Sequence, residues 1–146
     1  MRKGFDYFYK GAPDPLINYN FGKVEIKFPT LVDSYAIYDN KIIVKLFPKN
    51  LKEIHPQENP GRNIWCYRDD GKLLWKIEES PDWLRWLDEK SKEERGGILN
   101  DGHNDYYTSL IYIEREDKLY ARVVTGYYDL DPETGKVSNF TYDGGR

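Results

Sequence analysis

Several short segments of the chain have the apolar and polar pattern of β-strands. Residues 23–28 (KVEIKF) show this most clearly, because Val24, Ile26 and Phe28 alternate with three charged residues. In a strand, successive side chains point to opposite faces, so this segment has one apolar face and one charged face. The alternation predicts a strand with one face buried.

Further segments have strand-like content and are joined by short connections. They are residues 5–9, 35–38, 42–47, 63–67, 73–78, 109–114, 119–124, 127–130 and 137–142. The connections carry turn-forming pairs, namely Asp39-Asn40, Asp70-Gly71, Glu116-Asp117 and Thr134-Gly135. Links this short leave no room for crossover helices, so neighbouring strands should pair antiparallel. We therefore expect a mainly β chain of antiparallel meanders, with residues 1–146 forming a single domain.

One segment departs from the strand pattern and predicts one short helix at about residues 81–95. Ser80 and Pro81 suit the N-cap and the first helical position. Trp83 and Trp86 share one face at helical spacing, and the polar run that follows ends at a Gly-Gly pair. We expect this helix to dock through its tryptophan end.

Two longer segments, residues 48–62 and 96–105, show little periodicity. The first contains three prolines, and the second is rich in Gly, Asn and Asp. Both are predicted to be loops without regular structure, and loops of this length often carry function.

The chain contains an approximate internal repeat, in residues 34–78 and 109–142. Each copy has an apolar strand, an acidic turn before a lysine, a second strand, an aromatic third strand, an acidic Gly-Lys turn and a fourth strand. The first copy has a far longer loop between its second and third strands. Each copy predicts a four-stranded meander of the kind that forms one propeller blade.

Two stretches, residues 64–75 (IWCYRDDGKLLW) and 128–137 (YDLDPETGKV), resemble the outer strands of quinoprotein-type (PQQ-like) β-propeller repeats. In that family a strand, a turn with Asp and Gly, and a following Trp or large apolar residue recur once per blade, and this last residue packs between blades. The second copy departs from the pattern, since it has Ser138-Asn139-Phe140 instead of the tryptophan. The resemblance implies blade-like local geometry.

The two blade-like units fall short of a closed propeller, which has four or more blades. The quinone chemistry of the family uses the centre of a complete ring, so we expect no cofactor here. The two sheets could pack face to face, continue as one twisted sheet, or meet a second subunit. In size and aromatic content the chain also resembles small bacterial immunity proteins.

Composition adds a surplus of aromatic residues and argues against two classes of partner. The 146 residues include 13 Tyr, 6 Phe and 4 Trp, more than a core of this size requires. A net charge of −3, with acids and bases mixed, argues against broad attraction to nucleic acid or anionic lipid. No signal-peptide-like or membrane-spanning run occurs, and the one cysteine, Cys66, lies in an apolar stretch. We therefore expect a cytoplasmic protein with a buried thiol.

Candidate catalytic groups are sparse. His103 lies among Asn, Asp and Gly in residues 100–105, where an imidazole and carboxylates could bind a metal or act as a general base. No HExxH, Walker-loop, nucleophile-elbow or GxGxxG pattern accompanies it. Residues 131–135 (DPETG) fit a hairpin turn better than a calcium loop, whose longer pattern is absent. The sequence favours a non-catalytic protein without a bound metal.

Aromatic residues and arginines are the candidates for a binding surface, because Tyr, Trp and Arg dominate protein recognition. The candidates are Tyr106, Tyr107, Tyr127, Tyr128, Trp83, Trp86, Arg62 and Arg122. Neighbouring side chains of a strand point to opposite faces. Each adjacent tyrosine pair should therefore place one ring inside the protein and one outside.

Three functions fit these observations. The first is an inhibitor of another protein, of the immunity or anti-defence type, acting through an aromatic-rich β surface. The second is a sponge that sequesters a small nucleotide-like anion between the subunits of a homo-oligomer, which requires convergence of Arg62, Arg68, Arg115 and Arg122. The third is a metal-dependent hydrolase that uses the loop at residues 100–105. The lack of catalytic motifs favours the first function.

Overall fold

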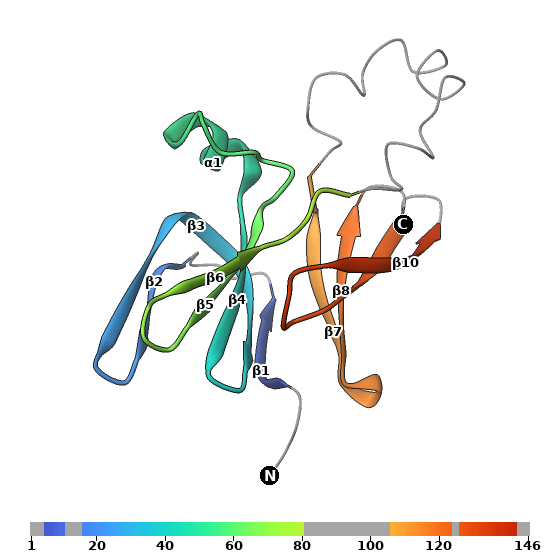
Figure 1. Cartoon of the computed structure of the whole chain (residues 1–146), viewed down its shortest axis with the longest axis horizontal. Coiled ribbons are helices and arrows are strands. Elements are labelled where there is room, and N and C mark those ends of the chain that lie inside the picture. Colours follow the sequence, from blue (N-terminus) through green and yellow to red (C-terminus); the bar gives the residue numbers. More distant parts are fainter. Residues whose placement is uncertain (1–4, 11–15, 81–105, 124–125, 143–146) are drawn as a thin grey trace.

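A computed structural model describes residues 5–10, 16–80, 106–123 and 126–142 of the chain (Figure 1). These residues form two antiparallel β-sheets and one α-helix in a single domain, so the predicted mainly β fold class is confirmed. The predicted helix at about residues 81–95, with Trp83 and Trp86, lies outside the described residues, as does the predicted loop at residues 96–105.

The first sheet has six strands and comes from the N-terminal part of the chain. Its strands are β1 (Phe5–Lys10), β2 (Leu16–Phe21), β3 (Val24–Tyr38), β4 (Lys41–Leu46), β5 (Ile64–Arg68) and β6 (Leu73–Lys76). Their order is β1-β3-β4-β5-β6, and β2 pairs with the first half of β3. Strands β3 to β6 follow one another as the first predicted meander, whereas β2 lies outside the predicted strands.

Strand β3 joins two segments that the sequence predicts as separate strands, residues 23–28 and 35–38. Its first half pairs with β2, and its second half pairs with β1 and β4. Pro29 lies at a register shift in the β2–β3 pairing, which suits a residue that has no N–H to donate. The strand therefore continues through a proline, and its first half turns over one face of the sheet.

The second sheet is a four-stranded meander from the C-terminal part of the chain. Its strands, in spatial order, are β7 (Ser109–Ile113), β8 (Lys118–Val123), β9 (Gly126–Leu130) and β10 (Val137–Tyr142). A 3-10 turn (Glu114–Glu116) joins β7 to β8, and Asp117 then has a left-handed backbone with φ of 50°. All neighbouring strands are antiparallel, as predicted.

Helix α1 (Pro48–Ile54) begins the segment at residues 48–62, so the prediction of an irregular loop was wrong there. Pro48 occupies the first turn, where its missing N–H has no intrahelical partner to lose. Leu51 is fully buried against the first sheet and anchors the helix, a tertiary contact that local periodicity does not report. Among the residues that the structure describes, no helix has the length and apolarity needed to cross a membrane.

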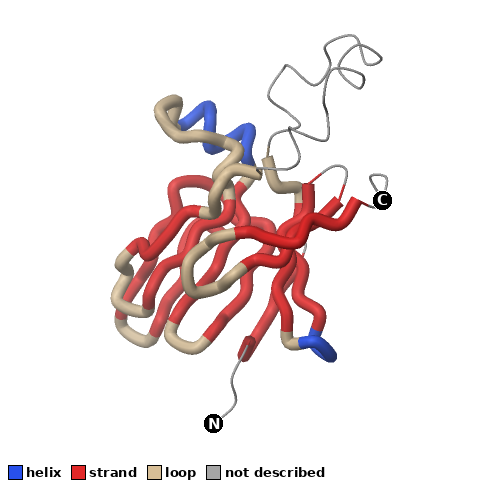
Figure 2. Tube along the Cα trace, turned by 45° about the vertical axis from the view of Figure 1, so that its right-hand side comes forward, coloured by secondary structure: helices blue, strands red, loops and turns tan. Residues whose placement is uncertain are grey.

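Both faces of the first sheet are covered. One face packs on the second sheet in a core that contains Ala36, Ile43, Cys66, Trp75, Leu119 and Tyr128 among others. The opposite face packs against the β2–β3 hairpin and α1, in a core that contains Ile26, Phe28, Val44, Leu51 and Trp65. Strands β4 and β5 are therefore apolar on both sides. Helix α1 and the 3-10 turn lie at opposite ends of the domain (Figure 2).

A buried amide joins the two sheets. Asn63, which is fully buried, donates from Nδ2 to the carbonyl of Tyr107 at 2.9 Å and to that of Leu46 at 3.1 Å. Its Oδ1 accepts the N–H of Tyr107 at 3.0 Å. The side chain thus pairs with the backbone of Tyr107 as a neighbouring strand would, just before the second sheet begins.

Trp75 lies between the two sheets and contacts the turn between β9 and β10. Its Nε1 donates to the carbonyl of Pro132 at 3.0 Å. Gly135 in this turn has a φ of 78°, and a Cβ at that position would lie 2.5 Å from Cε3 of Trp75. The turn therefore needs glycine both for its backbone conformation and for the close approach of the indole.

Candidate functional site

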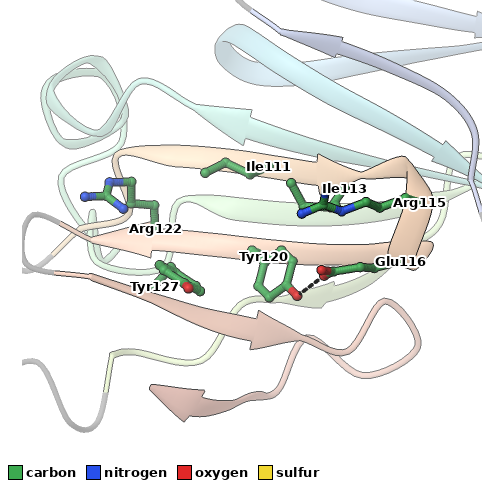
Figure 3. Close-up of a pocket in the computed structure, with 7 residues that line it drawn as sticks. All are labelled: Ile111, Ile113, Arg115, Glu116, Tyr120, Arg122 and Tyr127. Carbon is green, nitrogen blue, oxygen red and sulfur yellow. Dashed lines mark hydrogen bonds between the residues drawn. The ribbon is translucent and has the colours of Figure 1, made fainter. Parts of the chain in front are cut away.

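The outer face of the second sheet, which points away from the first sheet, is hollowed. The hollow has a volume of about 280 Å³ and lies over β7, β8 and β9 (Figure 3). It is lined by Ile111, Ile113, Arg115, Glu116, Tyr120, Arg122 and Tyr127, and we call it the outer hollow. It combines apolar, aromatic and charged groups on one surface.

Strand alternation and register bring these side chains together. In β8, alternate residues are buried in the core between the sheets, so Tyr120 and Arg122 point outward. The antiparallel register places Ile111 of β7 opposite Tyr120, and Tyr127 of β9 opposite Arg122. The lining is therefore built by three paired strands and by the 3-10 turn between β7 and β8, which contributes Arg115 and Glu116.

Tyr120 connects the two sides of the outer hollow. Its ring meets that of Tyr127 edge-on, with centroids 5.5 Å apart. Its hydroxyl donates to Glu116 Oε1 at 2.5 Å, as Figure 3 shows. This hydrogen bond to a carboxylate is the main cause of the raised pKa of Tyr120, about 12. The phenol therefore stays neutral near pH 7 and is held in one orientation.

Carboxylates near the outer hollow already have donors. Asp129 accepts from Lys118 Nζ at 3.0 Å and from Asn139 Nδ2 at 2.9 Å. Within the described part of the chain, the guanidinium of Arg115 has no hydrogen bond or ion pair. The lining itself contains two arginines and one glutamate, which leaves it positive on a chain whose net charge is −3.

Two residues predicted for a binding surface, Arg122 and Tyr127, line the outer hollow. The prediction that each adjacent tyrosine pair splits between inside and outside is confirmed. Tyr107 and Tyr128 are fully buried, whereas Tyr106 and Tyr127 are half-buried.

Tyr107 and Tyr128 stabilise the junction of the sheets. Their ring centroids lie 6.3 Å apart, and the Tyr107 hydroxyl donates to the carbonyl of Glu78 at 2.9 Å. The Tyr128 hydroxyl is hydrogen-bonded to that of Ser80. Burial raises the pKa of Tyr107 well above its ordinary value. Neither ring is exposed to a partner.

Tyr106 lies in a second hollow, beside α1. This hollow has a volume of about 400 Å³ and is also lined by Lys45, Phe47, Pro48, Lys49, Asn50 and Thr108. Its buried cation is already compensated, because Lys45 Nζ lies 2.8 Å from Asp33 Oδ2. The second hollow shares no lining residue with the outer hollow.

The arginines considered for an anion site do not all converge. Arg62 donates to two backbone carbonyls at and just beyond the end of β6, at 2.9 and 3.2 Å. Arg68 forms an ion pair with Asp70 at 2.5 Å, on an exposed turn of the first sheet. Arg115 and Arg122, by contrast, share the lining of the outer hollow.

The described residues contain no group of three or more His, Cys, Asp and Glu side chains placed to hold a metal ion. His55 Nε2 lies 3.0 Å from the carbonyl of Pro29 and ties the α1 segment to β3. Burial raises the pKa of Cys66 to about 12, so its thiol is neutral near pH 7. The predicted loop at residues 100–105, with His103, lies outside the described residues.

Sequence reasoning missed part of the lining. It did not single out Ile111, Ile113, Tyr120 or Glu116. A usable signal was present, because alternate residues of a hairpin share a face, and the turn at Glu116-Asp117 brings β7 and β8 together.

Comparison of the chain with protein-family models, with curated proteins and with solved structures gave no match. The outer hollow is therefore the basis for a functional proposal.

Proposed function

We propose that this chain is a non-catalytic binding protein that inhibits another protein by covering it with the outer face of its second sheet. The supporting observation is the outer hollow, where Ile111, Tyr120, Arg122 and Tyr127 lie together. Tyrosine and arginine are enriched at protein–protein contacts because they combine apolar area with polar tips. The hydrogen bond from Tyr120 to Glu116 holds one ring in place, which reduces the entropy lost on binding.

We infer an immunity or anti-defence role in the cytoplasm. A small domain can block a partner by steric cover alone, and a rigid sheet face is suited to that task. The buried, protonated thiol of Cys66 fits a reducing compartment.

The first test is capture of the partner by tagged protein from its native cytoplasm, with mass spectrometry of the captured material. We expect one stoichiometric protein partner, which Ile111→Asp loses because a charge then lies in the apolar floor. Ile17→Asp is the matched control, since Ile17 is 61% exposed on β2, away from the outer hollow. Circular dichroism establishes that both variants are folded.

The captured partner is then assayed for its own activity against added protein. Inhibition that saturates at one equivalent supports the proposal. Equal capture by Ile111→Asp and Ile17→Asp would place the contact elsewhere and reject it.

Sequestration of a small anion is a second candidate, favoured by the position of Arg115 and Arg122 beside two tyrosine rings. The volume of about 280 Å³ lies just below the range of about 300–1,000 Å³ that is usual for small-molecule sites. A homo-oligomer could enlarge the site. A nucleotide that co-purifies without any protein would support the sponge and reject the inhibitor.

A further inference from the structure

The floor of the outer hollow suits one large side chain. Ile111 and Ile113 alternate along β7, and Tyr120 lies opposite Ile111 on β8. In Figure 3 Ile111 and Tyr120 lie between the side chains of Arg122 and Arg115, and Ile113 lies beside Arg115. An aromatic side chain buries about 150–250 Å², so a single ring seated here would supply much of the apolar contact of a small interface.

The two guanidiniums lie apart along the outer hollow, because Arg122 is at one end and the side chain of Arg115 turns back beside Ile113 (Figure 3). Arg122 is in register with Ser109 at the start of β7, whereas Arg115 follows Ile113 at its end. Four steps along β7 at about 3.3 Å each separate Ser109, the partner of Arg122, from Ile113, beside which the Arg115 side chain lies, by roughly 13 Å. A ligand that reaches both arginines must therefore be extended.

The charge of the outer hollow favours an acidic ligand. Glu116 accepts the Tyr120 hydroxyl, and Asp129 is paired with Lys118 and Asn139. The lining keeps a net positive charge in spite of the acidity of the whole chain. Exposed ion pairs contribute little affinity, but they orient a partner and exclude those of the wrong charge.

We propose that the outer hollow binds an extended segment of the partner protein with the pattern acid-x-apolar-x-acid. Alternate side chains of an extended segment share a face, and residues i and i+4 are roughly 13 Å apart. The two acids then reach Arg115 and Arg122, while the middle side chain covers Ile111 and Ile113. This inference rests on the proposed protein-binding function of the same face and specifies the chemistry of the partner.

Two synthetic peptides test the inference directly. One is acetyl-Ser-Glu-Ser-Trp-Ser-Glu-Ser-amide, and the other replaces both glutamates by lysines. Amide NMR titrations of the isotope-labelled protein locate and quantify binding. We expect the acidic peptide to shift the amides of β7, β8 and β9 and to bind at least tenfold more tightly than the lysine peptide.

Charge reversal provides the matched variants. Arg115→Glu combined with Arg122→Glu should reverse the preference, so that the lysine peptide binds more tightly. Lys72→Glu combined with Lys136→Glu makes the same change in net charge at exposed positions outside the outer hollow, and should leave the preference unchanged.

The outcomes separate this inference from the proposed function. Equal binding of both peptides, or a preference that survives the arginine reversal, overturns the acidic-segment inference. Partner capture that is lost with Ile111→Asp but kept with the arginine reversal would overturn it too, while supporting the proposed function. Adenosine monophosphate is the third probe. If it shifts the same amides and binds more tightly than the acidic peptide, the ligand of the outer hollow is a small anion and the acidic-segment inference is overturned.

Discussion

Asn63 is fully buried although its side chain is polar, and its hydrogen bonds explain why. The amide satisfies both backbone groups of Tyr107 and adds a donor to the carbonyl of Leu46. A buried polar group that loses its partner costs about 1–3 kcal/mol. One side chain therefore has a large influence on the contact between the sheets.

Asn63→Ala should lower the free energy of unfolding by about 3 kcal/mol, because the backbone groups of Tyr107 lose their partners without access to water. Urea unfolding measures the change. Asn18→Ala is the control, since Asn18 makes an exposed hydrogen bond to Glu25 at 2.9 Å and should cost less than about 0.5 kcal/mol. Equal costs for the two variants would contradict a joining role for Asn63.

Glu116→Gln should lower the pKa of Tyr120 from about 12 towards its ordinary value of 10.0. The carboxylate favours the protonated phenol, so removing its charge makes ionisation easier. NMR titration of ring-labelled tyrosine measures this value. Glu114→Gln changes a neighbouring exposed acid outside the hollow and should leave the pKa of Tyr120 unchanged. An unchanged value in Glu116→Gln would show that the hydrogen bond is not formed in solution.

At the scale of elements, strand-like content between turn-forming pairs predicted most strands, and the period-two pattern identified those with one polar face, such as the first half of β3. Strand β3 shows its limit, since Pro29 divides the pattern although the strand continues through a register shift. Helix α1 shows a second limit. Its one fully buried residue, Leu51, is held by the first sheet, and this contact is not encoded in local periodicity.

The turn between β9 and β10 provides a prediction at this scale. Gly135→Ala should destabilise the protein by about 3 kcal/mol, from backbone strain and from displacement of Trp75. Gly22→Ala is the matched control, because Gly22 has a φ of 57° with nothing within 4 Å of a new Cβ, and strain alone should cost about 1 kcal/mol.

Urea unfolding measures the loss in free energy of unfolding for each glycine variant. The difference between the two losses is the contribution of the contact with Trp75. In a Trp75→Leu background, Gly135→Ala should lower the free energy of unfolding only as much as Gly22→Ala does. Equal losses in free energy of unfolding for the two variants in the wild-type background would show that Trp75 moves aside without destabilising the protein.

At the scale of the whole molecule, the candidate site was only partly predictable. In β8 (KLYARV), the apolar residues share one face, so the outward positions of Tyr120 and Arg122 follow from the sequence. In β7 (SLIYI), both faces are apolar, so its own residues do not decide that Leu110 points inward and Ile111 outward; only the pairing of Ile111 with Tyr120 of β8 does. The floor of the outer hollow therefore depends on tertiary structure.

Cys66 reports on the opening of the whole molecule, because it is fully buried in the core between the sheets. A thiol reagent should label the folded protein at pH 8 only through unfolding, at a rate that follows the unfolded population. Asn63→Ala should accelerate labelling about a hundredfold, since about 3 kcal/mol corresponds to roughly two powers of ten. Stoichiometric labelling of the native wild type within a minute would contradict this burial.

Every strand of the first sheet precedes every strand of the second along the chain. A ribosome therefore releases the first sheet with one face closed by the β2–β3 hairpin and α1, while the face around Ile43 and Cys66 has no cover. About 65 more residues must be synthesised before β10 is complete, which takes several seconds at about 5–20 residues per second. During that interval the nascent chain exposes an apolar sheet, so its yield of soluble protein should depend on chaperones at the tunnel exit.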